Sequence, residues 1–282
     1  HPPLFDKIRE SLRKQLNKIK ESIYNEKKHK GNLRHIIIRQ GMNTNQVLVI
    51  FVTRTHSINP LLYKFLPNLF PNIVSIIQNV NPERTNRILG KENIILYGKN
   101  YYQEKILDKT FNISASAFFQ VNVDQAKKMV NIIKEYLVSA HRLLDLYCGV
   151  GFFAIMLSEL AKKVIGIEIN ADAIHDAQKN AQLNNINNIE FIASSVENVI
   201  QDYKDIDTII LDPPRKGCSE KLLTNIIRMR PEKIIYISCN PATFARDLVI
   251  FQKYRYRLDK YHLIDMFPQT YHVESIAKIV AQ

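Results

Sequence analysis

A cysteine with the setting of a nucleophile stands at position 239, between an apolar run at 234–237 and the pair Asn240-Pro241. The apolar run predicts a buried strand, and Asn240 with Pro241 suits the cap and first turn of a helix. Ligands of an open α/β sheet bind at the carboxyl ends of its strands, and a helix N-terminus favours a thiolate. Cys239 is therefore a candidate nucleophile, although a cysteine seen alone is more often a small buried hydrophobe.

Two further turns at predicted strand ends carry groups that could bind a nucleotide-like ligand. Residues 145–151 read Asp-Leu-Tyr-Cys-Gly-Val-Gly, and their two glycines let the backbone approach a ligand and turn into a helix. Glu168 ends the next strand, where a carboxylate can accept both hydroxyls of a ribose. NAD and S-adenosylmethionine (SAM) both carry a ribose, so this pattern alone fits either an oxidoreductase or a methyltransferase.

The run 212–217, Asp-Pro-Pro-Arg-Lys-Gly, follows another apolar strand. Its prolines fix the backbone and hold Asp212 at the strand end, an element for which a nicotinamide enzyme has no evident use. Methyltransferases that act on amines place a base-stacking aromatic residue after a similar Asp/Asn-Pro-Pro. Here Arg215 stands in that place, and an arginine suits a phosphate or a carbonyl-rich base better than an exocyclic amine.

The other two cysteines, Cys148 and Cys218, give no disulfide framework and no metal-ligand spacing with Cys239. We therefore predict a reducing, cytoplasmic location and no metal site. Cys148 is expected to pack in the core. Cys218 shares the loop of Asp212 and is the reserve candidate for the nucleophile.

Composition is that of a globular protein with an excess of cations. The 282 residues have a formal net charge of +12, which favours polyanionic partners such as nucleic acid. The alternative is a solvated lysine-rich face that only aids solubility. The apolar run 47–52 is too short to cross a bilayer, and no signal peptide is visible at the start, His1-Pro2-Pro3, which suggests a fragment of a longer protein.

Residues 1–105 predict a small α+β domain that contacts RNA. A helix is expected from Leu4 to about Glu26, with Leu12, Leu16, Ile19 and Ile23 on its apolar stripe. Three strands and a short helix follow, at 34–39, 46–53, 72–78 and 60–69 respectively.

Residues 106–282 predict a second domain in which strands and helices alternate. This rhythm is typical of a doubly wound parallel sheet. The last two apolar runs, 256–265 and 272–280, are joined by a short link and are expected to pair as an antiparallel hairpin. A parallel sheet that ends in such a hairpin is the Rossmann-like plan of SAM-dependent methyltransferases. The predicted strands are 143–147, 163–167, 189–192, 207–211 and 233–237, and the predicted helices are 123–137, 152–160, 171–183, 196–203, 219–229 and 241–253.

Taken together, the motifs resemble those of the RNA uracil-5-methyltransferases, which make 5-methyluridine in transfer and ribosomal RNA. The resemblance covers about Phe111 to Gln282, and extends more loosely upstream to Arg34. It rests on 118–122 (Phe-Phe-Gln-Val-Asn), 145–149 (Asp-Leu-Tyr-Cys-Gly), 212–217, 238–241 (Ser-Cys-Asn-Pro) with Thr243, and 272–274 (His-Val-Glu).

The resemblance implies a reaction and a site for it. SAM would methylate C5 of a uridine in RNA, with ribosomal (23S) RNA expected ahead of transfer RNA. Cys239 would add to C6 of the uracil, and Glu274 would remove the C5 proton as general base. Arg215 and Phe119 would contact the substrate, with a core role equally open for Phe118 and Phe119. Asp212 could bind SAM or hold the uracil edge; the other expected SAM contacts are Gln120, Tyr147 and Glu168.

Three departures from the family pattern and two alternative functions stay open. Ser194-Ser195 stand where relatives often carry Gly-Asp, and Phe152 replaces a small polar residue of some members. No cysteine precedes Cys148, so no iron–sulfur cluster is expected. We also expect that the chain is a catalytic fragment without the leading RNA-binding barrel of many members. We expect a monomer. The alternatives are an NAD(P)-dependent oxidoreductase and a non-catalytic RNA-binding protein on the same fold.

Overall fold

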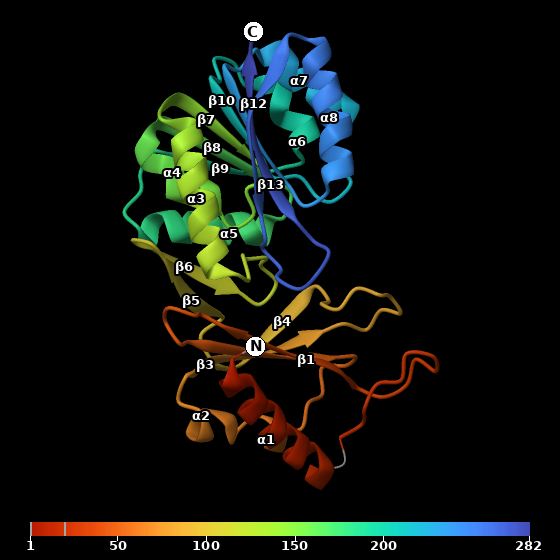
Figure 1. Cartoon of the computed structure of the whole chain (residues 1–282). Coiled ribbons are helices and arrows are strands. Elements are labelled where there is room, and N and C mark those ends of the chain that lie inside the picture. The colour runs from red at the N-terminus through yellow and green to blue at the C-terminus, as the bar shows by residue number, and fades with distance from the viewer. Residues whose placement is uncertain (1, 20) are drawn as a thin grey trace. The chain divides into compact units, whose positions relative to one another are not determined.

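The computed structural model describes residues 2–19 and 21–282 of the chain. The chain divides into two compact units (Figure 1). The first contains His1–Lys105 and Phe111–Ser116, and the second contains Ile106–Thr110 and Ala117–Gln282.

The first unit is built on a four-stranded sheet in the order β1-β2-β3-β4, in which only β2 and β3 run parallel. Ile8 and Leu12 of helix α1 (Pro3–Ile19) are buried in a hydrophobic core that the helix forms with this sheet. β2 is buried along its whole length, since it lies in the middle of the sheet. The strands and short helices are β1 (Leu33–Gln40), β2 (Val47–Thr53), η1 (Pro60–Leu62), α2 (Leu66–Leu69), β3 (Ile73–Val80) and β4 (Glu92–Gly98).

Helix α1 is shorter than the sequence predicts. It ends at Ile19, and residue 20 lies outside the described residues. Residues 24–31 form a tight hairpin instead, in which Asn25 N donates to Lys30 O at 2.7 Å. Gly31 allows the close turn, because a Cβ there would lie 2.1 Å from Ile23 O. Ile23 is accordingly 60% exposed rather than part of the apolar stripe.

The strands between residues 92 and 114 were not predicted from the sequence. β5 (Tyr101–Ile106) and β6 (Lys109–Ser114) form a two-stranded sheet, and only alternate residues near their ends are fully buried. β4 is an edge strand whose residues are mostly exposed. Such half-buried strands carry a weaker sequence signal than a strand covered on both faces.

The second unit has the predicted Rossmann-like sheet, in the order β12-β13-β11-β10-β7-β8-β9. β7 to β11 are mutually parallel, and β13 pairs antiparallel with both β11 and β12. The predicted hairpin is confirmed, with its second strand inserted next to β11. The strands are β7 (Ala140–Leu146), β8 (Ala161–Glu168), β9 (Ile189–Ala193), β10 (Thr208–Leu211), β11 (Lys233–Ser238), β12 (Tyr256–Ile264) and β13 (Glu274–Ala281).

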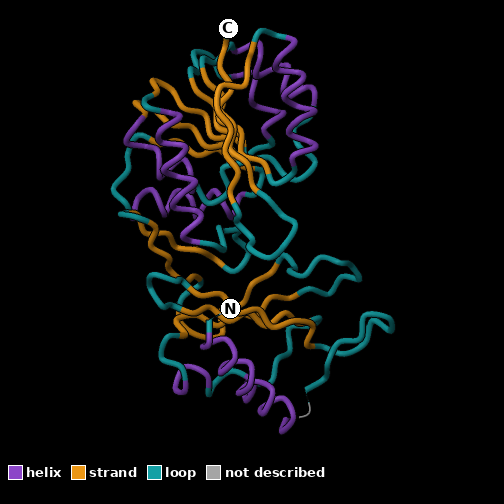
Figure 2. Tube along the Cα trace, in the orientation of Figure 1, coloured by secondary structure: helices purple, strands orange, loops and turns teal. Residues whose placement is uncertain are grey.

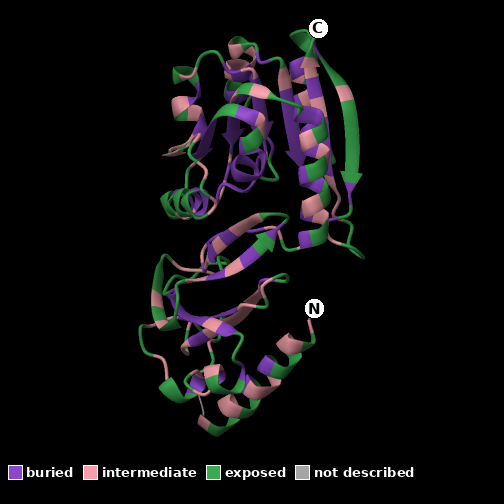
Figure 3. Cartoon of the chain, turned by 90° about the vertical axis from the view of Figure 1, so that its left-hand side faces the viewer, coloured by how far each residue is buried: buried purple, intermediate pink, exposed green. Residues whose placement is uncertain are grey.

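Helices cover both faces of this sheet (Figure 2). α3, α4 and α5 pack on one face, and α6, α7 and α8 pack on the other. The central strands between them are buried (Figure 3), which is why β10 and β11 appear in the sequence as unbroken apolar runs. The helices are α3 (Val123–Leu137), α4 (Phe152–Leu157), η2 (Ser158–Leu160), α5 (Ala171–Leu183), α6 (Val196–Val199), η3 (Ile200–Asp202), α7 (Glu220–Met229) and α8 (Pro241–Lys253).

Three of these helices begin where the sequence predicts, because an asparagine caps each of them. The side-chain oxygens of Asn122, Asn170 and Asn240 accept hydrogen bonds from backbone N–H groups of the first turn. Each cap therefore fixes the residue at which the helix begins. Two of the capped turns, those before α5 and α8, follow the carboxyl ends of parallel strands.

Candidate active site

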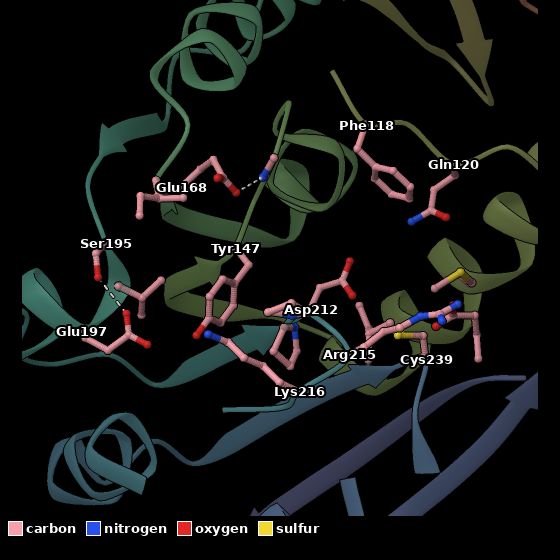
Figure 4. A pocket seen from close by; sticks show the side chains of 18 of the residues that line it. Phe118, Gln120, Tyr147, Glu168, Ser195, Glu197, Asp212, Arg215, Lys216 and Cys239 are labelled. Atoms are coloured by element: carbon pink, nitrogen blue, oxygen red, sulfur yellow. Dashed lines mark hydrogen bonds between the residues drawn. The ribbon is translucent and has the colours of Figure 1, made fainter. Parts of the chain in front are cut away.

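A cavity of about 700 Å³ opens at the carboxyl ends of the parallel strands in the second unit (Figure 4). It is lined by residues that follow β7, β8, β9, β10 and β11, together with the start of β13 and the segment before α3. It brings together seven of the residues predicted from the sequence, namely Gln120, Tyr147, Glu168, Asp212, Arg215, Cys239 and Glu274.

Cys239 lies in the turn between β11 and α8. Burial raises the pKa of its thiol, and the nearby carboxylate of Glu274 raises it further, whereas the guanidinium of Arg215 lowers it. The net pKa is above the ordinary thiol value. The neutral thiol is therefore favoured in this state of the site, and Arg215 is the cation that opposes this preference.

Glu274 is the first residue of β13 and lies opposite Cys239, which follows the neighbouring strand β11. Ser275 of β13 is paired with Ser238 of β11, so the same antiparallel register places Glu274 opposite Cys239. Burial raises the pKa of Glu274, and Arg215 lowers it. A carboxyl group with a raised pKa at this position is suited to take a proton at neutral pH.

Asp212 brings a second carboxyl group to the same part of the cavity. It follows β10, and its backbone N donates to Leu146 O at 3.4 Å. Burial and the negative charge of Glu274 raise the pKa of Asp212 to about 7. The cavity thus holds one thiol and two carboxyl groups near one guanidinium, and their charges are coupled.

The turn that carries Cys239 also holds the loop of Arg215. Asn240 Nδ2 and Thr243 Oγ1 both donate to Arg215 O, at 3.2 and 3.3 Å. The guanidinium reaches His272, with Nη2 3.3 Å from Nε2. Figure 4 shows the Arg215 side chain beside Cys239. Nucleophile and cation are therefore positioned by the same helix start.

An ion pair on α8, between the exposed Arg246 and the buried Asp247, fixes the rest of this loop. Asp247 is fully buried, and its Oδ2 accepts from Cys218 N at 2.9 Å and from Tyr236 OH at 2.7 Å. Its Oδ1 accepts from Arg246 Nε at 2.8 Å, and Arg246 Nη2 donates to Lys216 O and Cys218 O, both at 3.1 Å. Gly217 sits under this pair with φ +73°. Helix α8 thus sets the conformation of residues 216–218 through hydrogen bonds to their backbone.

The other two cysteines do not line this cavity. Cys218 is buried, with its Sγ 3.8 Å from Tyr236 OH, and burial raises its pKa to about 12. Cys148 is also buried, and burial raises its pKa well above the ordinary value. Cys239 is the only one of the three, all within the described residues, whose thiol could react with a molecule in the cavity.

At the other end of the cavity, the backbone holds the carboxylate of Glu168 in place. Gly149 N donates to its Oε2 at 3.3 Å, and Asn170 N donates to its Oε1 at 2.9 Å. Gly149 has φ +53°, and a Cβ there would meet no atom within 4 Å. A fixed carboxylate beside a bare, exposed backbone turn suits a ligand that carries a sugar diol.

Sequence reasoning missed several cavity residues, of which Ser195 and Glu197 form a pair. Ser195 Oγ donates to Glu197 Oε2 at 2.7 Å. Burial alone would raise the pKa of Glu197, but hydrogen bonds from Ser195 and a backbone N–H bring it below its usual value. Ser194-Ser195 stand where relatives often carry Gly-Asp, but the cavity still has an ionised carboxylate, which Glu197 supplies two residues later. The rule that identified Glu168, a polar residue just after a strand end, also identifies this pair.

The prediction for Phe119 needs a correction. Phe119 is buried in edge contact with Phe152, with ring centroids 5.5 Å apart, and lines only a small adjoining hollow of about 50 Å³. Phe118 is 70% exposed and lines the large cavity instead. Neighbouring residues in this extended segment point in opposite directions, and the sequence does not show which of the two faces the core.

Two further properties bear on the site. Within residues 2–19 and 21–282, no group of three or more His, Cys, Asp or Glu side chains could hold a metal ion. No helix in the same described ranges is long and apolar enough to cross a membrane.

The sheet order and the cavity at its strand ends define the class of the protein. The second unit has the Rossmann-like fold of the SAM-dependent methyltransferases. A structure of this class, the Pyrococcus abyssi tRNA (uracil-54, C5)-methyltransferase in complex with S-adenosyl-L-homocysteine, is 34% identical and superposes with a TM-score of 0.82. The match covers 96% of this chain and 66% of the Pyrococcus chain.

The chain belongs to the tRNA (uracil-5-)-methyltransferase family, whose model matches residues 87–280. An RNA methyltransferase of Oceanobacillus iheyensis, itself described as uncharacterized, is 42% identical over 275 residues. One from Clostridium tetani with the same description is 42% identical over 280 residues. These matches cover 95% and 96% of this chain but only 60% and 61% of the relatives, so the chain spans about three fifths of their length.

Proposed function

We propose that this chain carries the catalytic unit of an enzyme that transfers a methyl group from SAM to C5 of a uridine in RNA. The observation that supports this most directly is the placement of Cys239 opposite Glu274 at one end of the cavity. Glu168 and the Gly149 turn lie at the other end. The cavity thus has one region suited to a pyrimidine and another suited to a nucleoside cofactor.

The residues at the cofactor end fit SAM. Glu168, held by Gly149 N and Asn170 N, would accept the ribose hydroxyls, and Tyr147 and Gln120 line the same space. The Pyrococcus abyssi relative was crystallised with S-adenosyl-L-homocysteine. Bound SAM supplies an electrophilic methyl group on a sulfonium. Glu197 lies beyond Tyr147 and is positioned to accept a hydrogen bond from an amino group of the adenine.

Cys239 would activate the pyrimidine. C5 of uracil is too weak a nucleophile to attack a sulfonium methyl group unaided. Once the Cys239 thiol has lost its proton to solvent, the thiolate would add to C6, the C5–C6 π electrons would pass to the O4 carbonyl as an enolate, and C5 would become nucleophilic. Arg215 is placed to stabilise both the thiolate and the developing negative charge on the ring. C5 would then take the methyl group from the sulfonium of SAM, whose S–CH3 bond breaks with S-adenosyl-L-homocysteine as the leaving group.

Glu274 would complete the reaction. Its carboxylate removes the proton from C5, the double bond re-forms between C5 and C6, and the thiolate leaves. Asp212, whose pKa is raised by the charge of Glu274, would hold a proton and donate a hydrogen bond to the uracil edge or contact SAM. The two carboxyl groups would thus act in different protonation states.

The class of RNA separates two versions of the proposal. The names of the matched family model and of the Pyrococcus relative specify transfer RNA, whereas the bacterial relatives are named for RNA alone. We propose ribosomal RNA ahead of transfer RNA, as expected from the sequence. Methylation assays on 23S ribosomal RNA and on transfer RNA, each transcribed without modifications, decide between them.

The test of the mechanism uses RNA that contains 5-fluorouridine. Fluorine at C5 cannot leave as a proton, so incubation with SAM should trap a protein–RNA adduct that survives denaturation. Cys239→Ala should form no adduct, and Cys218→Ala is the matched control that should form it as the native chain does. Glu274→Gln should accumulate adduct on ordinary uridine and turn over about 10²- to 10⁴-fold more slowly.

Each alternative function predicts a distinct result, either in this assay or in a measurement of thermal stability with NAD and S-adenosyl-L-homocysteine. An adduct that persists in Cys239→Ala would move the nucleophile to another residue. RNA binding without adduct or methyl incorporation would favour the non-catalytic RNA-binding protein. Stabilisation by NAD but not by S-adenosyl-L-homocysteine would favour the oxidoreductase.

A further inference from the structure

Two loops of the first unit present cations to solvent and are joined to each other. They are residues 24–31, the hairpin before β1, and residues 81–90, which connect β3 to β4. We call them the basic loop pair. Both project toward the right-hand side of the first unit in Figure 1.

Two arginines connect the loops. Arg34 of β1 stacks on the Tyr24 ring of the hairpin, with its guanidinium carbon 4.4 Å from the ring centroid. Its Nη1 donates to Asn81 O and Glu83 O of the second loop, both at 2.7 Å. In addition, Arg84 Nη2 of the second loop donates to the hairpin backbone, to the carbonyl of residue 27, at 3.2 Å. The two loops are therefore one structural element, although residues 32–80 separate them in the sequence.

Buried asparagines hold the second loop in one conformation. Asn79 and Asn81 are 0% and 1% exposed. Asn81 Nδ2 donates to the carbonyls of residues 87 and 88 at 2.7 and 2.9 Å, and Asn79 Oδ1 accepts from Gly90 N at 2.7 Å. Residues 82–88 are nevertheless all exposed. The loop is thus ordered by its base and not by burial of its own side chains, so little conformational freedom remains to be lost on binding.

The surface that these loops present is strongly cationic. Five lysines and arginines oppose two carboxylates, those of residues 26 and 83, and all five cations are exposed: Lys27, Lys28, Lys30, Arg84 and Arg87. Among the described residues, the side chains of Lys28, Lys30 and Arg87 have no hydrogen-bond or ion-pair partner. Their charges are free to neutralise an anionic ligand.

We propose that the basic loop pair binds the sugar–phosphate backbone of the RNA substrate, as a second contact separate from the cavity. The inference rests on the proposed function for its RNA partner. Unpaired lysine and arginine side chains on an ordered surface attract successive phosphates and release their counterions. Such contacts position the nucleic acid without reading its sequence, whereas the choice of uridine is left to the cavity.

The experiment compares two triple variants of the first unit with equal loss of charge. Lys28→Ala/Lys30→Ala/Arg87→Ala removes three unpaired cations of the loop pair and keeps every hydrogen bond described above. Lys7→Ala/Lys14→Ala/Lys18→Ala removes three exposed cations from α1 and is the matched control. The probe is a fluorescein-labelled RNA hairpin with uridines in its loop. Its affinity is measured by fluorescence anisotropy between about 50 and 200 mM KCl.

The loop variant should bind the hairpin at least about tenfold more weakly at low salt. The slope of log affinity against log salt should become shallower by roughly two to three, since each lost phosphate contact contributes about 0.7 to 0.9. The control should keep the native affinity and slope. Native binding by the loop variant, or equal losses in both variants, would overturn the proposal.

A third variant tests the role of Arg34 as a positioning residue. Arg34→Ala keeps all five surface cations but removes one of the two connections between the loops, and leaves that of Arg84. We expect weaker binding with an unchanged salt slope, because the phosphate contacts persist while the loops lose their order. Arg34→Lys, which lacks the planar guanidinium that stacks on the Tyr24 ring, should behave in the same way. An unchanged affinity in both variants would show that the loops need no such connection.

The outcome is separable from that of the proposed function. The same native preparation is tested for adduct formation with 5-fluorouridine RNA. If the adduct forms and the loop variant binds RNA as the native chain does, only the inference about the loops fails. If the loop variant loses affinity and no adduct forms in any preparation, the proposed reaction fails and the RNA-binding surface remains.

Discussion

Arg215 is the residue on which the charges of the reaction centre converge. Its guanidinium lowers the pKa of both Cys239 and Glu274, and thereby opposes the effect of burial on each of them. It also faces His272. An uncharged side chain at this position would leave the Cys239 thiol and the Glu274 carboxyl group without the positive charge that lowers their pKa.

The raised pKa of Cys239 predicts how adduct formation depends on pH. An acid with a raised pKa is mostly protonated at neutral pH, so the rate of adduct formation with 5-fluorouridine RNA should rise as the pH increases through that pKa. Arg215→Gln removes the charge that lowers the pKa and should shift this rise to higher pH. Glu274→Gln removes a charge that raises it and should shift the rise to lower pH.

The measurement is the initial rate of adduct formation between neutral and alkaline pH, in the native chain and both variants. Thr224→Ala, on the outer surface of α7, is a control expected to leave the profile unchanged. Shifts of the two variants in the same direction would contradict the assignment of opposite roles to Arg215 and Glu274.

At the scale of elements, helix α8 supports the loop that carries Arg215. Asp247→Asn keeps the shape of the side chain but removes the charge that Arg246 and the Tyr236 hydroxyl contact inside the protein. We expect a loss of about 1.5–3 kcal/mol in the free energy of unfolding, the usual contribution of a hydrogen bond to a charged group. Urea unfolding gives this value, and single-turnover rates show whether the reaction slows beyond the loss of folded protein.

Gly217→Ala perturbs the same loop from the other side. The backbone φ of +73° is unfavourable for alanine, and its Cβ would lie 2.6 Å from Arg246 Nη2. Thr224→Ala, on α7 and outside the cavity, is again the control. Only Gly217→Ala should alter the pH profile of adduct formation, because only its loop carries Arg215. Identical profiles in both variants would show that the loop tolerates the change.

The elements of the second unit could be predicted from the sequence because burial on both faces leaves a strong pattern. The apolar strands β10 and β11 and the starts of α3, α5 and α8 all lie within a residue or two of their predicted positions. Seven of the predicted site residues line one cavity. All of them except Gln120 and Glu274 end or follow a parallel strand, and parallel strands end at one edge of the sheet. The hairpin at residues 24–31 could not be predicted, because its order comes from Arg34 and from backbone pairing rather than from periodicity. The choice between Phe118 and Phe119 depends on packing against Phe152, which no local pattern encodes.

At the scale of the whole molecule, the proposed cofactor should stabilise the fold. A ligand that binds only the native state stabilises it by about 2.7 kcal/mol at a hundred times its Kd, which corresponds to a rise of roughly 5–10 °C in Tm for a unit of this size. S-adenosyl-L-homocysteine should produce this shift, and NAD should not. Glu168→Ala should abolish the shift, whereas Glu190→Ala, an exposed carboxylate on β9, should retain it. Thermal unfolding monitored by circular dichroism measures all four cases, and a full shift in Glu168→Ala would remove that residue from the cofactor site.

Strand β13 is the last strand of the second unit's sheet along the chain, but in that sheet it lies between β11 and β12. During translation, both neighbours therefore leave the ribosome before the strand that joins them. The nascent chain already contains Cys239 at that stage but not the residue opposite it. A polypeptide released early would have a nucleophile without its candidate base, and its β11 edge would be open to pairing with other chains.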